Sequence, residues 1–215
     1  MAVTITHGYA SLAELKDWLM PNIGSTDGTY DDRLSLSINA ASRAIERETG
    51  RRFYTNETDE TRYVTAVDAT ELIERDLGVD VISLTSLKTD EDGDHTYERT
   101  WTTGDYDLEP ANAAVDSQPY TRIAVSPSGS YAFPAGIAKG VQLVGKFGYC
   151  TTSGQDSWAG DIKAACLIQA ARNYERAVTP MGIAGNSAFG QMRLQEKLDP
   201  DVAVILGRLR RGLAY

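Results

Sequence analysis

Residues 31–53 read DDRLSLSINAASRAIERETGRRF, and this stretch predicts the long amphipathic helix around which the chain folds. One helical face is apolar, because its members recur at spacings of four, three and four residues: Leu34, Ile38, Ala41 and Ile45. The other face carries charge at Arg43, Glu46 and Arg47. Gly50 can adopt the left-handed conformation that ends a helix. On this pattern alone, the segment is typical of an amphipathic helix in any small domain, with its charged face in water.

The charge of the chain is distributed unevenly. The formal net charge of the 215 residues is −9, yet residues 57–116 alone carry −13 and the remainder carries +4. This asymmetry indicates different environments for the two parts. An overall basic nucleic-acid binder is disfavoured, since affinity for phosphate needs clustered Lys and Arg. The length fits one domain or two small ones.

Two cysteines, Cys150 and Cys166, are too few for a disulfide framework and predict free thiols in a reducing cytoplasm. The first ten residues, MAVTITHGYA, lack the charged and apolar regions of a signal peptide. No apolar run approaches the roughly 20 residues that span a bilayer. The sequence therefore predicts a protein that folds in the cytoplasm and has no membrane partner.

Two further helices are predicted on either side of the middle of the chain. Ser11 and Glu14 have the spacing of a capping box, which predicts a helix that runs to about Met20. Another helix is expected from Asp161 to about Val178. Its apolar stripe consists of Leu167, Ala170, Ala171, Tyr174 and Val178.

The end of the chain predicts a short helix. Asp199 suits the N-cap and Pro200 suits the first helical position. The apolar stripe of this helix consists of Val202, Ile205, Leu206 and Leu209. Gly212 is expected to end the helix. Three arginines would then crowd the last turn, where the helix dipole favours positive charge: Arg208, Arg210 and Arg211.

Short β runs between turn clusters fill the middle of the chain. The expected strands cover residues 61–66, 70–73, 79–88, 96–102, 106–108, 120–125 and 140–149, and a further short strand is expected at 191–194. Gly93 supplies a positive φ to an expected hairpin turn. The sequence therefore predicts an α+β fold, in which a bundle of about four helices carries an inserted antiparallel β-sheet or small barrel. The expected domains are N-terminal helices in 1–55, the β-rich insertion in 56–150 and C-terminal helices in 151–215.

Few residues of the chain could support catalysis. The only histidines are His7 and His95, and no G-x-S-x-G motif is present. Residues 140–147 read GVQLVGKF and resemble a phosphate-binding loop, but Phe147 stands where Ser or Thr would hold magnesium. The residues between the two glycines are apolar, which favours a buried strand. We therefore expect no enzymatic activity and no cofactor.

Two groups of residues have side chains of the kind that bind metal ions. Asp90, Asp92 and Asp94 could attract calcium, but the glycine and the bidentate glutamate of an EF-hand loop are not at their positions. A solvated hairpin turn is the favoured interpretation, and calcium binding remains the alternative. Cys150 and Cys166 lack the spacing of a zinc site. No metal site is expected.

Several stretches together resemble the head-to-tail connector, or adaptor, proteins of tailed bacteriophages. They are YASLAELK at 9–16, NAASRAIE at 39–46, TGRRF at 49–53, IKAACLIQAAR at 162–172 with YER at 174–176, and LDPDVAVIL at 198–206. Each stretch is short, so the resemblance depends on their order and spacing. It covers the helical parts of the chain well and the β-rich insertion only loosely.

The resemblance implies a structural protein of the virion at the head–tail junction, assembled in the host cytoplasm. Proteins of this family form a ring beneath the portal, which is twelve-fold in the virion, complete the head, seat a downstream stopper or tail connector and continue the DNA channel. For the ring interface we expect Arg43, Glu46 and Arg47, on the charged face of the long helix. For portal docking we expect the C-terminal residues Arg208, Leu209, Arg210, Arg211, Leu213 and Tyr215. DNA would pass the acidic insertion without specific binding.

Two other classes of function were considered. One is a soluble ligand- or carbohydrate-binding β module of a minor tail protein, which requires exposed aromatic side chains on the sheet. The candidates are Trp101, Tyr106, Tyr120 and Tyr131, although such residues more often fill a core. The other is an enzyme, which requires a convergent polar pocket.

Overall fold

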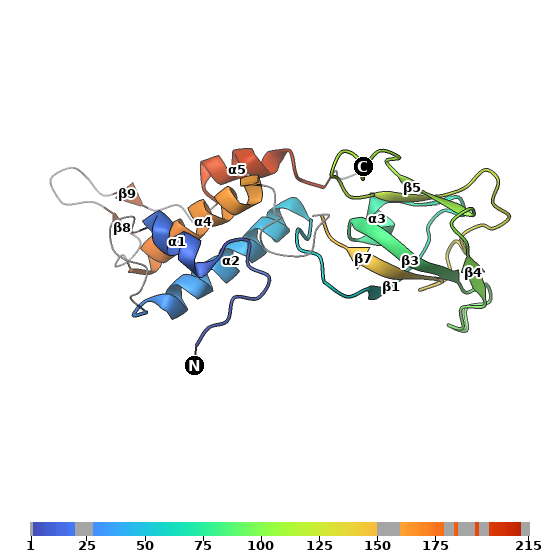
Figure 1. Ribbon diagram of the computed structural model, residues 1–215, viewed down its shortest axis with the longest axis horizontal. Helices are drawn as coiled ribbons and strands as arrows, with labels where there is room; N and C mark the ends of the chain where they lie inside the picture. Colours follow the sequence, from blue (N-terminus) through green and yellow to red (C-terminus); the bar gives the residue numbers. More distant parts are fainter. Residues whose placement is uncertain are drawn as a thin grey trace. The chain divides into compact units, whose positions relative to one another are not determined.

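The computed structural model describes residues 2–19, 28–149, 160–178, 183–184, 192–193 and 198–211 (Figure 1). The chain is an α+β protein, as the sequence predicts. Its helices are α1 (Leu12–Leu19), α2 (Asp31–Thr49), α3 (Glu74–Leu77), α4 (Gly160–Val178) and α5 (Pro200–Gly207). Its strands are β1 (Glu60–Val64), β2 (Glu71–Leu72), β3 (Val81–Thr89), β4 (Arg99–Trp101), β5 (Tyr106–Glu109), β6 (Arg122–Val125), β7 (Val141–Phe147), β8 (Ile183–Ala184) and β9 (Met192–Arg193).

The described residues form two compact units. The helical unit contains the chain up to Gly50 and again from Gly160 to Arg211, and the β unit contains Arg51 to Tyr149. The chain therefore enters the β unit directly after the helix that the sequence identified as central. Four of the five helices belong to the helical unit, and the short α3 belongs to the β unit.

The helical unit is built on the antiparallel-packed pair α2 and α4, and α1 and α5 each contact both of these helices. The predicted apolar stripe of α2 is confirmed, because all four of its members are buried: Leu34, Ile38, Ala41 and Ile45. α2 ends at Gly50, whose φ of +67° is the left-handed conformation and whose N–H donates to the carbonyl of Glu46 at 2.8 Å. The capping box of α1 is also present, because Glu14 accepts from the backbone N–H of Ser11 at 2.8 Å.

The buried stripe of α4 is wider than the sequence predicts. Besides Leu167, Ala170, Ala171 and Tyr174, three residues on an adjoining line are fully buried: Ile162, Ala165 and Cys166. The reason is that α4 contacts three other helices, so it buries more than the single stripe of a surface helix.

The β unit consists of two antiparallel sheets, with strand orders β1-β7-β3-β4 and β2-β6-β5. A single bridge between Val81 and Tyr120 joins them. Each of the seven strands predicted for this region is present, and most ends move by one to three residues. Two-residue strands β8 and β9 pair with each other, and β9 falls within the strand expected at 191–194. α3 was not expected, since four residues are too few to show helical periodicity.

Residues 140–147 form a buried strand and not a phosphate-binding loop. They contain β7, the central strand that pairs with both β1 and β3. Gly145, the second glycine of the near-match, lies where β3 approaches so closely that a Cβ atom would stand 2.1 Å from the carbonyl oxygen of Ser83. The register between β3 and β7 shifts beside this residue. Gly145 is therefore required by strand packing.

The prediction for the end of the chain is partly wrong. Asp199 caps α5 and Pro200 begins it, as expected, and Val202 and Leu206 are buried. The helix, however, ends at Gly207, so the three arginines lie beyond it and not in its last turn. Gly207 has a high cost inside a helix, which favours termination there. The expected end at Gly212 lies outside the described residues.

Candidate functional site

The chain passes from the helical unit to the β unit through Thr49-Gly-Arg-Arg-Phe53. Thr49 is buried, and its hydroxyl donates to the carbonyl of Ile45 at 2.8 Å. Phe53 is fully buried and contacts the ring of Tyr149 at a centroid distance of 5.2 Å. The two arginines between them lie against the β unit. This stretch is therefore a structural junction.

Arg51 carries the innermost ion pair of the junction. Its guanidinium group contacts the carboxylate of Asp80, which is fully buried, and lies 2.8 Å from that of Glu74. The same group lies 5.4 Å from the ring centroid of Tyr149. Such a partner offsets the burial of the carboxylate, because transfer of an unpaired charge out of water is costly.

Arg52 pairs with a different part of the β unit, at the start of β1. It makes a two-pronged ion pair with Glu60 at 2.7 and 3.2 Å. Burial raises the pKa of Glu60, but hydrogen bonds and charges from Arg52 and Arg62 outweigh it and hold the pKa below its usual value. Both arginines of the junction are therefore committed to intramolecular contacts.

The three residues expected at the ring interface differ in their contacts on the surface of α2. Arg43 donates to Glu46 at 2.7 Å and to the carbonyl of His7 at 3.0 Å, and Glu46 also accepts from the hydroxyl of Tyr9. These two side chains therefore hold the segment that precedes α1. Arg47, by contrast, is exposed.

Arg47 lines a shallow groove of about 450 Å³ in the helical unit. The walls of the groove come from α2 and α4, and one end is closed by the residue before the N-cap of α5. Its lining residues are Ala40, Ala44, Arg47, Glu48, Gln169, Asn173, Arg176 and Leu198. No local sequence signal marks this groove, because the polar residues of α4 recur at helical spacing, as they do on an ordinary solvated face.

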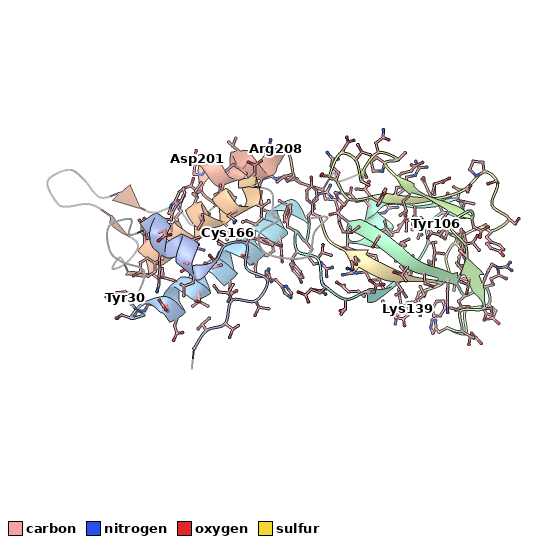
Figure 2. All side chains as sticks on the ribbon, in the orientation of Figure 1. Tyr30, Tyr106, Lys139, Cys166, Asp201 and Arg208 are labelled. Carbon is pink, nitrogen blue, oxygen red and sulfur yellow. The ribbon has the colours of Figure 1, made fainter. Side chains whose placement is uncertain are left out.

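The C-terminal arginines fold back onto their own helical unit. Arg208, labelled in Figure 2, pairs with Asp161 at the start of α4. Arg210 pairs with Glu48 on α2, and the backbone N–H of Arg211 donates to the carbonyl of Thr49 at 2.8 Å. Leu209 is partly buried. Leu213 and Tyr215, the other two residues expected to dock on the portal, lie outside the described residues.

The acidic turn after β3 is organised by its own carboxylates. Asp90 is buried and accepts from the backbone N–H groups of Asp92, Gly93 and His95. Burial raises the pKa of Asp90, and these hydrogen bonds lower it further than burial raises it. Gly93 has the expected positive φ, +85°. Carboxylate oxygens of Asp90, Asp92, Asp94 and Glu98 lie within 4.8 Å of one another. The backbone hydrogen bonds of the turn thus explain the position of the Asp90 carboxylate. The other three acidic side chains of this group are exposed.

The aromatic residues proposed for ligand binding belong to the core of the β unit. Trp101 is buried, stacks on Phe133 at a centroid distance of 4.7 Å and donates from its indole N–H to Thr89. Tyr106, labelled in Figure 2, is also buried. Tyr120 and Tyr131 are half-buried and pack against the same cluster. These four residues stabilise the fold and do not form an exposed binding surface.

Three solved chains that share this fold come from the neck or the virion of a gene transfer agent (GTA) particle. The chain aligns over its full length with 96% of a chain from "Neck of empty GTA particle computed with C6 symmetry", at a TM-score of 0.61 and 21% identity. A chain from "Neck of native GTA particle computed with C12 symmetry" also aligns, over 100% of this chain and 96% of that one, at 0.58 and 20%. A third, from the virion of the native gene transfer agent (GTA), aligns over 99% of this chain and 96% of that one, at 0.59 and 21%.

The resemblance to head-to-tail connectors is therefore confirmed at the level of the fold. No protein-family model matches the sequence, and no curated protein matches it. Within the described residues, no helix has the length and apolar character needed to span a membrane.

Proposed function

We propose that the protein is a head-to-tail connector of a tailed phage or phage-like particle, which forms a ring beneath the portal and continues the DNA channel. The observation that carries the proposal is the structural similarity, which extends over both units to chains from necks of a gene transfer agent. A neck lies between head and tail, and a connector must fill that place. In this proposal the protein is structural and non-catalytic, needs no cofactor and resides in the virion after assembly in the host cytoplasm.

The ring is formed by the helical unit, within residues 1–55 and 151–215, and is twelve-fold. Arg43, Glu46 and Arg47 serve this interface in two ways. Arg47 is exposed and contacts the neighbouring copy directly. Arg43 and Glu46 act through the segment before α1, which they hold in place at His7 and Tyr9. Symmetric neck particles solved in C6 and C12 support a cyclic arrangement.

Portal docking is assigned to Arg208, Leu209, Arg210, Arg211, Leu213 and Tyr215. The pairs Arg208–Asp161 and Arg210–Glu48 involve side chains that are half or more exposed on the arginine side. Exposed pairs of this kind contribute at most about 1 kcal/mol each. Exchange of Asp161 and Glu48 for acidic groups of a portal therefore costs little, and the arginines remain suited to docking.

The β unit, within residues 56–150, is assigned to the channel and to the downstream stopper or tail connector. Its net charge is strongly negative, because residues 57–116 alone carry −13. A surface of this charge repels the phosphate backbone and leaves DNA free to slide. Duplex DNA should therefore show no measurable binding to the protein at physiological salt.

The docking assignment is tested by co-sedimentation of the protein with purified portal from the same particle. Deletion of residues 207–215 should abolish attachment, and the double change Arg210→Glu and Arg211→Glu should weaken it at least tenfold. Arg75→Glu, an exposed arginine of the β unit, is the matched control and should bind as the wild type does. Unchanged affinity in the deletion variant would remove the C-terminal segment from the docking site.

A further inference from the structure

The groove of the helical unit has two walls with regular helical spacing. On α2, Ala40, Ala44 and Arg47 follow one another at intervals of four and three residues, so they share one stripe. The stripe on α4 is formed by Gln169, Asn173 and Arg176 at the same intervals. The alanines leave space for a bulky group between the helices. The two arginines place positive charge along the space, and the acidic lining residue, Glu48, is paired with Arg210.

α5 shows which kind of side chain packs into the seam between α2 and α4. Its N-cap Asp199 pairs with Arg172 at 2.8 Å, and the residue after its end, Arg208, pairs with Asp161. α5 therefore runs antiparallel to α4 and covers its first half, where Val202 and Leu206 become buried. The groove is the part of the seam that α5 leaves uncovered, so a further apolar group fits there.

The charge of the groove specifies its occupant further. Arg47 and Arg176 make no ion pair with any residue that the structure describes. An occupant with a carboxylate beside a large apolar side chain would match both the space between the helices and the charge of the arginines, since arginine binds carboxylates and aromatic faces alike.

The chain itself carries such a group at the end of α1. Trp18 is 53% exposed, which is unusual for so large an apolar side chain, and its neighbour Asp17 is exposed as well. Asp17 makes no ion pair within the described part of the chain. Tryptophan is among the residues that contribute most to protein interfaces. Trp18 and Asp17 thus match the groove in size and in charge.

The groove and the segment joined to α1 lie on different sides of α2. Three residues of α2 hold that segment. Asn39 donates to the carbonyl of Thr4 at 3.0 Å, Arg43 donates to the carbonyl of His7 at 3.0 Å, and Glu46 accepts from the hydroxyl of Tyr9. At 100° per residue, the stripe of Ala40, Ala44 and Arg47 is rotated away from this side. An interface between two different surfaces of identical chains is heterologous and closes into a ring when the rotation permits.

We propose that Trp18 and Asp17 of one copy enter the α2–α4 groove of the next copy, with Asp17 against Arg47 and Arg176. The inference rests on the proposed ring and names the surfaces that form it. The contact involves no residue of the C-terminal docking segment, although Glu48 of the groove pairs with Arg210 of that segment.

Cross-linking between differently tagged full-length chains tests which surfaces meet. Both chains carry Cys150→Ser and retain the buried Cys166. One chain carries Ala13→Cys, which lies one turn before Asp17 on an exposed position of α1, and the other carries Ala44→Cys. At a concentration where wild-type rings form, a short bis-maleimide should join this pair at least ten times more often than it joins Ala44→Cys to Val115→Cys, a highly exposed position of the β unit. Equal yields from the two pairs would overturn the proposal.

Charge exchange provides the second arm of the test. Arg176→Asp should raise the concentration needed for ring formation at least tenfold, and Asp17→Arg in the same chain should restore it. Arg75→Asp should have no effect. Rings that assemble normally with Arg176→Asp would contradict the groove assignment and leave the connector function intact. A wild-type chain that never forms rings, alone or on a portal, would instead contradict both the groove and the proposed ring.

Discussion

The helical unit and the β unit have cores of different composition. The centre of the helical unit is small and partly polar, since Ser42 and the thiol of Cys166 face each other at 3.6 Å between α2 and α4. The β unit has a core of large aromatic and aliphatic side chains and two fully buried carboxylates, Asp80 and Asp90. Small residues let helices approach closely, and the groove of the helical unit lies at the seam between α2 and α4. The two units therefore differ in the size and polarity of the side chains at their centres.

Loss of the Arg51–Asp80 pair should produce the largest effect and should be confined to the β unit. Arg51→Ala leaves the carboxylate of Asp80 buried without its guanidinium partner, which should lower the free energy of unfolding by about 3–5 kcal/mol. Native-state hydrogen exchange would measure this in β3 and β7, while the amides of α2 should keep their protection. Arg75→Ala, which removes an exposed arginine of the same unit, should cost almost nothing. Equal loss of protection in α2 would show that the units do not unfold separately.

Truncation of Ile45 should give the reverse pattern. This side chain is fully buried in α2, so Ile45→Ala should lower the stability of the helical unit by about 2–4 kcal/mol. Exposed Arg47 lies two residues further on, and Arg47→Glu should leave thermal unfolding unchanged while it weakens ring formation. Differential scanning calorimetry and light scattering separate these outcomes. A similar loss of thermal stability in both variants would refute the assignment of the two faces.

Alkaline pH should weaken the helical unit through Cys166, which lies inside it (Figure 2). Burial raises the pKa of this thiol to about 11. An unfolded cysteine has a pKa of about 8.5, so the folded state holds its proton more tightly. Stability is therefore fully present below pH 8.5 and is lost as the pH rises toward 11, by about 3 kcal/mol. Urea unfolding of the wild type and of Cys166→Ala at several pH values should show this slope only in the wild type. Parallel curves would contradict the burial of the thiol.

Removal of the N-cap of α5 should cause the smallest loss of stability. Asp199 accepts from the backbone N–H of Asp201 at 3.0 Å and pairs with Arg172. Asp199→Ala should cost about 1 kcal/mol and lower Tm by a few degrees in circular dichroism. Asp201→Ala is the control, because this exposed side chain does not cap the helix. If both variants melt at the same temperature, the cap does not stabilise α5.

Local sequence signals predicted most of the fold. The stripe of α2, the cap at Gly50 and the strands of the β unit follow from periodicity and from turn residues close by in the chain. α3 was missed because four residues show no period, and α5 was predicted too long because Gly207 and Gly212 are both plausible ends. The role of Gly145 could not be predicted from the local sequence, because its close contact comes from β3, far away in sequence.

The site was much less accessible from the sequence. Arg51 and Asp80 are 29 positions apart, and nothing local indicates that they pair. The groove combines α2 and α4, which only tertiary packing brings together. The sequence placed Arg43, Glu46 and Arg47 on one charged face, but it could not show that the first two hold the segment before α1. The resemblance to connectors came from several short stretches, and one of them, residues 49–53, has a structural role at the junction.

Cryo-electron microscopy of the purified protein mixed with portal from the same particle tests the connector assignment most directly. The proposed function predicts portals capped by a ring of twelve copies, with helical units in lateral contact and a central channel through the ring. Bare portals beside free protomers, or a compact dimer that ignores portals at any concentration, would contradict it.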